Sequence, residues 1–315
     1  MVRRHELTDA QWQTIESLLP GNGAPGGQWA DHRRVINGVL FRARTGVPWP
    51  DLPERYGPWQ TVYERHRRWS ADGTWQRILT ELQIEADASD PDGALARSAA
   101  KEAEWAVNID STSCRAHQHA AGARHRPPGD FPQKGGGARV EADGREALGR
   151  SRGGLTSKVH FLADDRARPL VWQTSPGQRG DIPMLVPVLE RLRIARRGPG
   201  RPRTRPDRLR GDKAYSSRDT RAYLRRRHIK VTIAQPEDQR ARRRRRGRSG
   251  GRPPAFDTGQ YRRRSAAERC VSKWKQFRAV ASRYDKRDYI FNGTLAVTAV
   301  VIWLRDTVQE PSETP

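Results

Sequence analysis

WAVNIDS, at residues 105–111, is the stretch that decides how the second half of this 315-residue chain folds. An apolar, β-favouring run that ends directly in an acid predicts a strand whose end carries a polar group. Two more β-rich runs follow, and then two that alternate with helical segments near Asp181–Arg193 and Ser217–Arg227. The four runs are SKVHFLAD (157–164), PLVWQTS (169–175), RLRGDKA (208–214) and IKVTIAQ (229–235). This order predicts an α/β domain in which helices pack on a mixed sheet.

The residues ahead of this stretch have helical periodicity and hold six of the ten tryptophans. Thr8 predicts the N-cap of a helix, DAQWQTIESLLP, that Pro20 ends. A second helix is expected from Asp31 to Arg44, with Gly46 after it, and Pro58 is placed to open a third, WQTVYERHRRW. These features predict a small all-α domain in front of the sheet.

The third of these helices combines basic and aromatic residues. Arg65, Arg67 and Arg68 share it with Tyr63 and Trp69, a mixture suited to a DNA groove. Because a turn-rich segment precedes the helix, we predict a helix-turn-helix-like module in which the three arginines contact DNA. An ordinary amphipathic helix with a solvated basic face is the alternative.

Basic residues dominate the chain: 60 Lys and Arg against 36 Asp and Glu give a formal net charge of +24 and a pI near 11.2. Such an excess indicates a polyanionic partner. Lys and Arg side chains that neutralise phosphates release condensed counterions, and this release gives affinity for nucleic acid. The alternative is that a GC-rich genome raises the arginine content of all its proteins. Arg191–Arg210 holds nine arginines and Arg240–Arg248 seven, and neither stretch can bury a core. We expect surface loops there, over 191–210 and 240–252, that grip the DNA backbone or merely solubilise the chain.

Composition also predicts how the chain is divided. The segment 83–104 is polar, acidic and alanine-rich, so we expect a linker between a helical DNA-binding domain (1–82) and an α/β domain (105–305), with a disordered tail at 306–315. Two cysteines are too few for a disulfide framework, and the N-terminal segment lacks an apolar signal, which favours a reducing cytoplasm. The apolar run Ile290–Leu304 is broken by polar residues and predicts a buried helix, not a membrane span.

Two aspartates follow predicted strands. Asp110 ends WAVNIDS, and Asp212 follows a short strand and opens a loop before a helix. A carboxylate at the end of a central strand is rigidly held and exposed, although each of these residues also suits an ordinary turn or cap. Carboxylates from separate elements are the ligands that a pair of Mg²⁺ ions needs to activate one oxygen and stabilise another at a phosphodiester.

A third acid, Glu268, lies in a predicted amphipathic helix over residues 261–284. Tyr261, Arg264, Glu268 and Lys275 fall on one polar stripe of that helix, and an apolar stripe beside it can dock on the sheet. Arg264 can hold the carboxylate and Lys275 can reach a phosphate of DNA. A solvated i,i+4 salt bridge is the alternative for Arg264 and Glu268.

The spacing Tyr-x2-Arg-x3-Glu-x6-Lys in this helix resembles the signature of the insertion-sequence DDE transposases, and the chain looks closest to insertion-sequence family five. The resemblance extends from about Leu7 through Trp303. It also covers NIDST around Asp110, GRSRGGLTSKVH (149–160), TSPGQRGD (174–181) and GDKAYSS (211–217).

This resemblance implies an RNase-H-like catalytic domain in which Asp110, Asp212 and Glu268 bind two Mg²⁺ (or Mn²⁺) ions. In such enzymes water attacks at the terminal inverted repeats of the element, and the freed 3′-hydroxyl then attacks target DNA. Double-stranded DNA is the implied partner, contacted by Tyr261, Lys275 and Arg152 among others; a homodimer on paired ends and a cytoplasmic, nucleoid-associated location are expected by analogy. A DNA-binding regulator and a structure-selective nuclease remain the alternatives.

Overall fold

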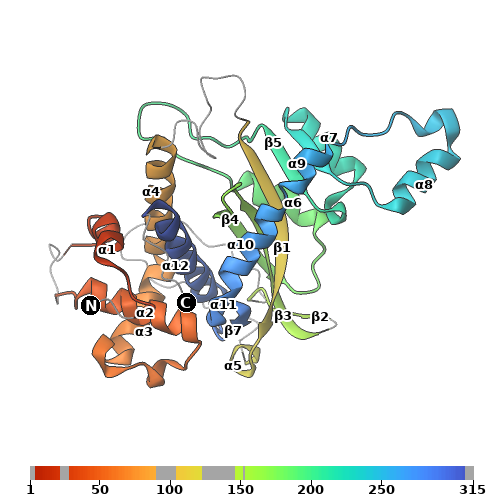
Figure 1. Cartoon of the computed structure of the whole chain (residues 1–315). Helices are drawn as coiled ribbons and strands as arrows, with labels where there is room; N and C mark the ends of the chain where they lie inside the picture. Colours follow the sequence, from red (N-terminus) through yellow and green to blue (C-terminus); the bar gives the residue numbers. More distant parts are fainter. Residues whose placement is uncertain (1–3, 22–27, 90–103, 123–145, 152, 309–315) are drawn as a thin grey trace.

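A mixed sheet of seven strands organises the chain after residue 104 (Figure 1). The computed structural model describes residues 4–21, 28–89, 104–122, 146–151 and 153–308. The strands are β1 (Ala106–Ala116), β2 (Gly149–Ser151), β3 (Gly154–Ala163), β4 (Pro169–Pro176), β5 (Arg208–Gly211), β6 (Lys230–Ile233) and β7 (Ser282–Arg283). All five strands predicted from the sequence are present.

β1 is the central strand. On one side β3 pairs antiparallel with β1, and β4 pairs antiparallel with β3. On the other side β5 pairs parallel with β1, and β6 pairs parallel with β5. β2 extends the outer side of β3, and β7 pairs with the far end of β1. Three antiparallel strands followed by two parallel strands that return through helices form the RNase-H-like arrangement, which confirms the predicted fold class.

Helices cover the sheet and bury its aromatic side chains. Phe161 of β3 and Trp172 of β4 are paired in register and therefore share a face. Both rings contact Trp274, with centroids 5.4 and 5.6 Å away. The long helices around the sheet are α6 (Ile182–Glu190), α7 (Arg218–Arg226), α10 (Ser265–Lys275), which carries Trp274, and α12 (Asp288–Thr307). The large aromatic area buried by these rings anchors α10 on β3 and β4.

Four helices precede the sheet: α1 (Asp9–Glu16), α2 (His32–Thr45), α3 (Trp59–Ala71) and α4 (Thr74–Ser89). Thr8 caps α1 in a capping box with Gln11, Asp31 caps α2, and Gly46 ends α2 with a left-handed φ of 73°. The starts of α1 and α2 and the end of α2 confirm the prediction, whereas α1 ends at Glu16, before Pro20. The remaining elements are α5 (Gln118–Ala121), α8 (Glu237–Arg245), α9 (Thr258–Arg262), α11 (Arg278–Ala281), and the 3-10 turns η1 (Trp49–Asp51), η2 (Glu54–Tyr56), η3 (Lys213–Tyr215) and η4 (Gly247–Gly250).

The helical part does not end where the sequence suggested. α4 continues through Ser89, so the predicted linker is wrong over 83–89, while residues 90–103 lie outside the described part. Gln83 is buried and its Nε2 donates to Leu170 O of β4 at 2.9 Å. α12 packs against both α3 and α4, so the C-terminal helix shares one core with the N-terminal helices. The predicted tail likewise begins later, because α12 includes Asp306 and Thr307.

The apolar run near the end of the chain is the interior of α12. Every residue from Gly293 to Leu304 is buried, which confirms the prediction of a core helix. Over the described residues, no helix combines the length and apolar character that crossing a membrane requires.

A buried polar chain joins the N-terminal helices to the segment before α12. Arg42 of α2 pairs with Asp285 at 3.0 Å, and Asp285 accepts a hydrogen bond from Thr294 at 2.9 Å. Trp75 Nε1 donates to Nδ1 of His66, which assigns the ring proton to Nε2, facing Thr294 Oγ1 at 3.3 Å. Burial lowers the pKa of His66 to about 4, so the ring is neutral at physiological pH. Each of these buried side chains thereby has at least one polar partner.

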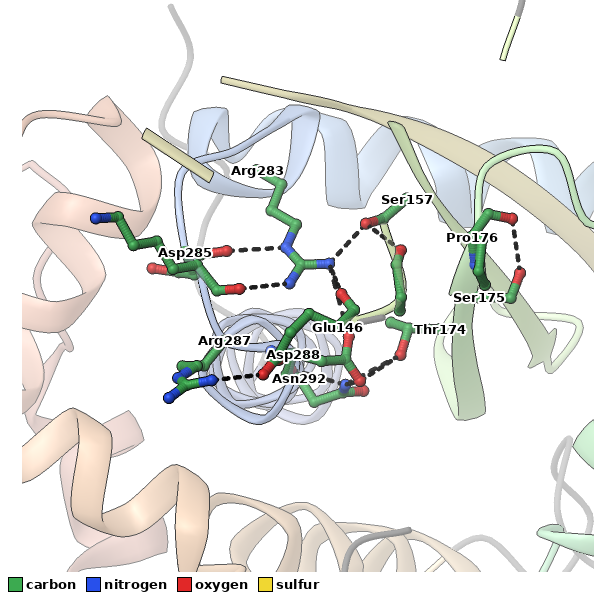
Figure 2. A network of polar contacts seen from close by, with 12 residues as sticks. Glu146, Ser157, Thr174, Ser175, Pro176, Arg283, Asp285, Arg287, Asp288 and Asn292 are labelled. Carbon is green, nitrogen blue, oxygen red and sulfur yellow. Dashed lines mark hydrogen bonds and ion pairs between the residues drawn. The ribbon is translucent and has the colours of Figure 1, made fainter. Parts of the chain in front are cut away.

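Arg283 is the centre of a second buried network (Figure 2). Its guanidinium donates to Ser157 Oγ at 2.6 Å, to Glu146 O at 2.8 Å and to Asp285 O at 2.9 Å. The Glu146 carboxylate in turn accepts the Asp288 N–H at 2.6 Å, at the first residue of α12. This network fastens β7 and the start of α12 to the sheet.

Substitution of Gly293 tests the contact between α12 and the N-terminal helices. A Cβ at this position would lie 1.8 Å from Ser70 Oγ of α3. Alanine normally stabilises a helix interior by about 1 kcal/mol relative to glycine. Here we expect Gly293→Ala to lower the free energy of unfolding by about 1–3 kcal/mol, because it overpacks the helix contact. Urea unfolding measures the free energy of unfolding of each variant.

A second substitution and a control make the test specific. Ser70→Gly in the same chain should restore part of the lost free energy of unfolding. Gly122→Ala is the control, because a Cβ there would have no atom within 4 Å. A stabilised Gly293→Ala variant would contradict the packing.

Candidate active site

Asp110 and Asp212 lie side by side, directly after the last pair of residues that joins β1 and β5 in parallel. Ile109 of β1 pairs with Gly211 of β5, so the next residue of each strand is an aspartate. Gly211 permits this close approach, since a Cβ there would lie 2.8 Å from Ile109 Cγ2. Asp110 Oδ1 accepts from the N–H of Ser111 at 2.8 Å, and Asp212 Oδ1 accepts from that of the following lysine at 2.6 Å. The two acids are therefore neighbours, although the predicted end of the strand at Asp110 is wrong: β1 continues to Ala116, and Asp110 lies where its pairing with β5 stops.

Glu268 lies on α10 and is linked to Asp110 through Arg264, although the helix predicted over 261–284 is wrong as a single element. Tyr261 belongs to α9, and α10 begins at Ser265 with Arg264 as its N-cap. At the junction the Arg264 N–H donates to Tyr261 O at 3.0 Å, which is the spacing of a tightened 3-10 turn. This break directs the Arg264 side chain toward β1 instead of leaving it on a continuous stripe.

Arg264 bridges two of the acids. Its Nη2 lies 2.5 Å from Glu268 Oε1, and its Nη1 lies 3.6 Å from Asp110 Oδ2. The i,i+4 salt bridge considered from the sequence is thus present, but the same guanidinium also reaches across to the sheet. In the part of the chain that the structure describes, no three His, Cys, Asp or Glu side chains are grouped to hold a metal ion. In this conformation the Arg264 guanidinium already lies between the carboxylates of Asp110 and Glu268.

The electrostatics around Asp110 favour a cation. Burial raises the pKa of Asp110, and the nearby carboxylates of Asp212 and Asp181 raise it further. The Ser111 N–H and Arg264 lower it. Asp110 therefore meets two other acids with one arginine to compensate, and positive charge brought to this strand end would relieve the repulsion between them.

The other members of the predicted stripe flank the open edge of β1. β5 pairs with β1 only up to Ile109 and β7 only from Arg115, so the intervening stretch has no strand partner on that side among the described residues. Lys275, which is exposed, donates from Nζ to Ser113 O in this stretch at 2.9 Å. The Tyr261 ring lies 5.6 Å from the Arg264 guanidinium carbon. Cationic side chains from α10 thus lie along the strand that carries Asp110.

Asp181 is a neighbour of the site that the sequence interpretation missed. It occupies the N-cap position of α6 but makes no capping hydrogen bond. Its Oδ1 instead lies 2.8 Å from Lys158 Nζ and 3.5 Å from His160 Nδ1, both on β3. Although burial opposes ionisation, hydrogen bonds from His160, Lys158 and Ser111 lower the pKa of Asp181. The signal available in the sequence was the acid that closes TSPGQRGD, directly after a strand.

Asp181 lies behind Ser111, the residue next to Asp110. His160 pairs in register with Ser111, so it shares a face of the sheet with Ser111, while the next residue along, Phe161, faces α10 with Asp110. Ser111 interacts with both Asp181 and Tyr215, and Tyr215 ends the turn that follows Asp212. The two strand-end aspartates are therefore connected behind the sheet through Ser111.

The basic face predicted for α3 is wrong for Arg65. Arg65 is buried, with its Nη1 2.6 Å from His32 Nδ1 and its guanidinium carbon 4.0 Å from the Trp29 ring centroid. Arg67 is paired with Glu64 at 2.7 Å. Arg68 is exposed on this helix. α3 packs on α2, α4 and α12, so Arg65 belongs to the helical core, while contact of Arg67 and Arg68 with DNA stays a prediction. Arg152, another predicted contact, lies outside the described residues.

The two arginine-rich stretches differ from each other. Residues 240–252 are not simply a loop, since α8 and η4 fall within or across them. Residues 191–207 are irregular apart from one bridge between Ile194 and Arg203, and the predicted loop is wrong over 208–210, which belong to β5. Arg203, in the stretch 191–210, pairs with Asp87 of α4 at 3.0 Å. Part of this stretch therefore helps to hold the N-terminal helices in place.

Comparison with known proteins places this arrangement in a family. Residues 102–303 match the family model “Transposase DDE domain”, which covers well over half of the chain. The chain belongs to this family of DDE transposases. Residues 7–79 match a second model, “Putative transposase of IS4/5 family”. Membership confirms the resemblance seen in the sequence and implies a transposase that uses divalent metal ions.

The chain is also similar to individual proteins and solved structures. “Uncharacterized protein y4sN” of Sinorhizobium fredii is 39% identical over 129 residues, which are 40% of this chain and 90% of that protein. “Putative transposase for insertion sequence element IS6501” of Brucella ovis is 28% identical over 151 residues, 48% of this chain and 100% of that protein. Among solved structures, “Crystal structure of a pre-cleavage Mos1 transpososome” aligns over 96% of this chain and 86% of that chain, with a TM-score of 0.24 and 9% identity.

The contacts of Asp181 with Lys158 and His160 can be tested by substitution. Asp181→Asn removes the carboxylate that Lys158 and His160 contact behind Ser111, and an unpaired, mostly buried ammonium there should shift the strand next to Asp110. We expect DNA strand cleavage to fall about tenfold or more, on the scale of a displaced catalytic group, while DNA affinity is unchanged. Lys158→Met added to Asp181→Asn should recover part of the rate. Glu190→Gln, at the other end of α6, is the control; equal losses in the single and double variants would argue against the unpaired lysine as the cause.

Proposed function

We propose that this protein binds the terminal inverted repeats of its mobile element, cleaves the ends by metal-dependent hydrolysis and joins the 3′-hydroxyl to target DNA by transesterification. The observation that carries the proposal is the parallel pairing that sets Asp110 beside Asp212, together with Arg264, whose guanidinium contacts both Asp110 and Glu268. Family membership supplies the transposase class; the cleavage and joining steps are our assignment.

The donor set fits two Mg²⁺ or Mn²⁺ ions. Asp110, Asp212 and Glu268 offer hard carboxylate oxygens, the ligand type that these ions prefer, and the repulsion at Asp110 creates a local demand for positive charge. When bound, such ions activate an attacking oxygen and stabilise the leaving oxygen of the phosphodiester. Glu268 is 60% exposed, so its side chain has room to turn from Arg264 toward the aspartates.

The chain's own residues would position the DNA. Arg264 and Lys275 lie along the open edge of β1, where their charges can pair with phosphates next to the bond that is cut. Arg264 can exchange its carboxylate partners for a phosphate, which would release Glu268 and Asp110 together. In this proposal DNA binding and assembly of the metal site are therefore coupled through one side chain.

Double-stranded DNA, both element ends and target, is the proposed partner. A homodimer on two paired ends, in the cytoplasm and associated with the nucleoid, fits this reaction, because two ends must be cut together. Hydrolysis without joining is the second candidate, since the same three carboxylates would serve a nuclease. The formation of joined products distinguishes the two.

Arg264→Met tests the proposed competition directly. Removal of the guanidinium between Asp110 and Glu268 should raise the affinity of the DNA-free protein for Mn²⁺ by about tenfold, equivalent to about 1.4 kcal/mol. Binding is measured from the electron paramagnetic resonance signal of unbound Mn²⁺. Arg269→Met on the same helix is the matched control, because Arg269 bonds to Ser265 Oγ and not to the acids. Unchanged or weaker Mn²⁺ binding would count against the bridge as a competitor.

Asp212→Asn tests the reaction itself. The substitution removes one ligand charge and leaves the basic surfaces intact, so DNA binding should persist while cleavage falls by at least about 10³-fold, a loss typical of one essential electrostatic group. The assay incubates the protein with the inverted repeats flanking its gene, a target plasmid and Mg²⁺, and sequences the junctions. Cleavage that persists in Asp212→Asn would refute the assignment, and cut ends without junctions would favour the nuclease.

A further inference from the structure

The arginine arm, residues 235–252, leaves the edge of the sheet. The chain exits β6 at Ile233, forms α8 and η4, and returns to α9 before α10. Figure 1 shows α8 set apart from the rest of the molecule, on the side away from the N-terminal helices. No residue of α8 or η4 is buried. The arm therefore contributes nothing to the core of the chain.

α8 is nevertheless a helix whose order has a local cause. Glu237 and Asp238 occupy its first turn and four arginines its last, the distribution that complements a helix dipole. Glu237 pairs with Arg240 at 2.6 Å and with Arg244 at 2.5 Å, and Asp238 pairs with Arg242 at 3.3 Å. A basic segment that needed only to be soluble would not require these internal pairs. The pairs instead preform a rigid helix that projects arginines into solvent.

The charge of the arm indicates a phosphate backbone as its partner. Seven arginines within nine positions face only two acids, and six of the seven are exposed. An α-helix is about 10–12 Å across with its side chains, which matches a DNA major groove about 12 Å wide. The deep, narrow major groove of duplex RNA would not admit the helix. Duplex DNA is therefore the partner that the arm fits.

The base of the arm is attached to the loop that carries Asp212. Gln239 Nε2 donates to Ser216 O at 2.8 Å, and Ser216 Oγ donates to Gln239 Oε1 at 3.0 Å. Ser216 is the C-cap of η3, the turn whose N-cap is Asp212. Arg221 braces the same region by donating to Ile233 O at 2.7 Å. A movement of α8 would therefore displace Ser216 through Gln239, and with it η3, the turn that begins after Asp212.

We propose that the arginine arm is a duplex-DNA clamp that also positions Asp212, with Gln239 and Ser216 as the coupling pair. The inference rests on the proposed function and deepens it, because it names the surface that holds DNA beside the site and the route by which bound DNA orders a metal-binding carboxylate. The other arginine-rich stretch lies at the opposite end of β5, since the chain enters β5 at Arg208 and leaves it at Gly211 for Asp212.

Salt-dependent DNA binding tests the clamp. We expect the triple variant Arg242→Gln, Arg244→Gln, Arg245→Gln to bind an inverted-repeat duplex more weakly. The slope of log K against log[salt] should shrink by up to about 2.7, or roughly 0.9 for each phosphate that is no longer neutralised. The matched control is Arg191→Gln, Arg193→Gln, Arg205→Gln, which removes the same charge from exposed positions beyond the other end of β5. Equal slopes for arm variant and wild type, equal effects of the two triples, or equal competition by duplex RNA would overturn the clamp.

Gln239→Ala tests the coupling. Because Gln239 carries no charge, the variant should keep the wild-type DNA affinity and salt slope but cleave at least about tenfold more slowly, as expected when a catalytic group is displaced. Gln239→Glu, which keeps an acceptor for Ser216 Oγ but loses the donor to Ser216 O, should cleave at an intermediate rate. Ser249→Ala is the control, because the Ser249 hydroxyl donates to Arg246 O within the arm itself. Wild-type cleavage by Gln239→Ala would overturn the coupling. Wild-type protein that binds DNA but cuts nothing would instead refute the proposed function, so the two failures are distinguishable.

Discussion

The parallel pairing of β1 with β5 is the constraint on which the rest of the site depends. It sets Ile109 beside Gly211 and so forces the next residues, Asp110 and Asp212, into a shared environment where their charges repel. A fold does not keep like charges together without a compensating cation. In this conformation Arg264 supplies it, and the family's divalent ions are the natural replacement.

The same logic explains why the helical and sheet parts cannot be treated as separate modules. Arg42 and His66 reach Asp285 and Thr294, and Arg283 ties the adjacent β7 to the sheet. β7 in turn pairs with the end of β1 beyond the acids. A displacement of the N-terminal helices would therefore move the strand that carries Asp110.

What the sequence predicted well has local causes. Strand runs, the cap at Thr8, the start of the helix near Asp31 and the order of elements follow from short-range patterns, which also sufficed to place Asp212 directly after a strand, whereas β1 runs past Asp110 to Ala116. Long-range contacts explain the errors. Arg65 is buried because Trp29 comes from a distant segment, and Asp181 acquires its partners only when α6 folds onto β3. The helix in the arginine arm could have been found, since its paired acids and arginines are spaced for it.

The distribution of arginine shows why net charge alone was an incomplete guide. Arg42, Arg168, Arg210 and Arg283 are buried, where each pairs with an acid or donates to backbone and serves the fold. These residues add to the formal charge of +24 but present no charge to a partner. The arginines of α8 do the opposite: they stabilise no core and remain solvent-exposed on a preformed helix. Burial therefore separates arginines that hold the protein together from those available to hold DNA, and composition cannot make that distinction.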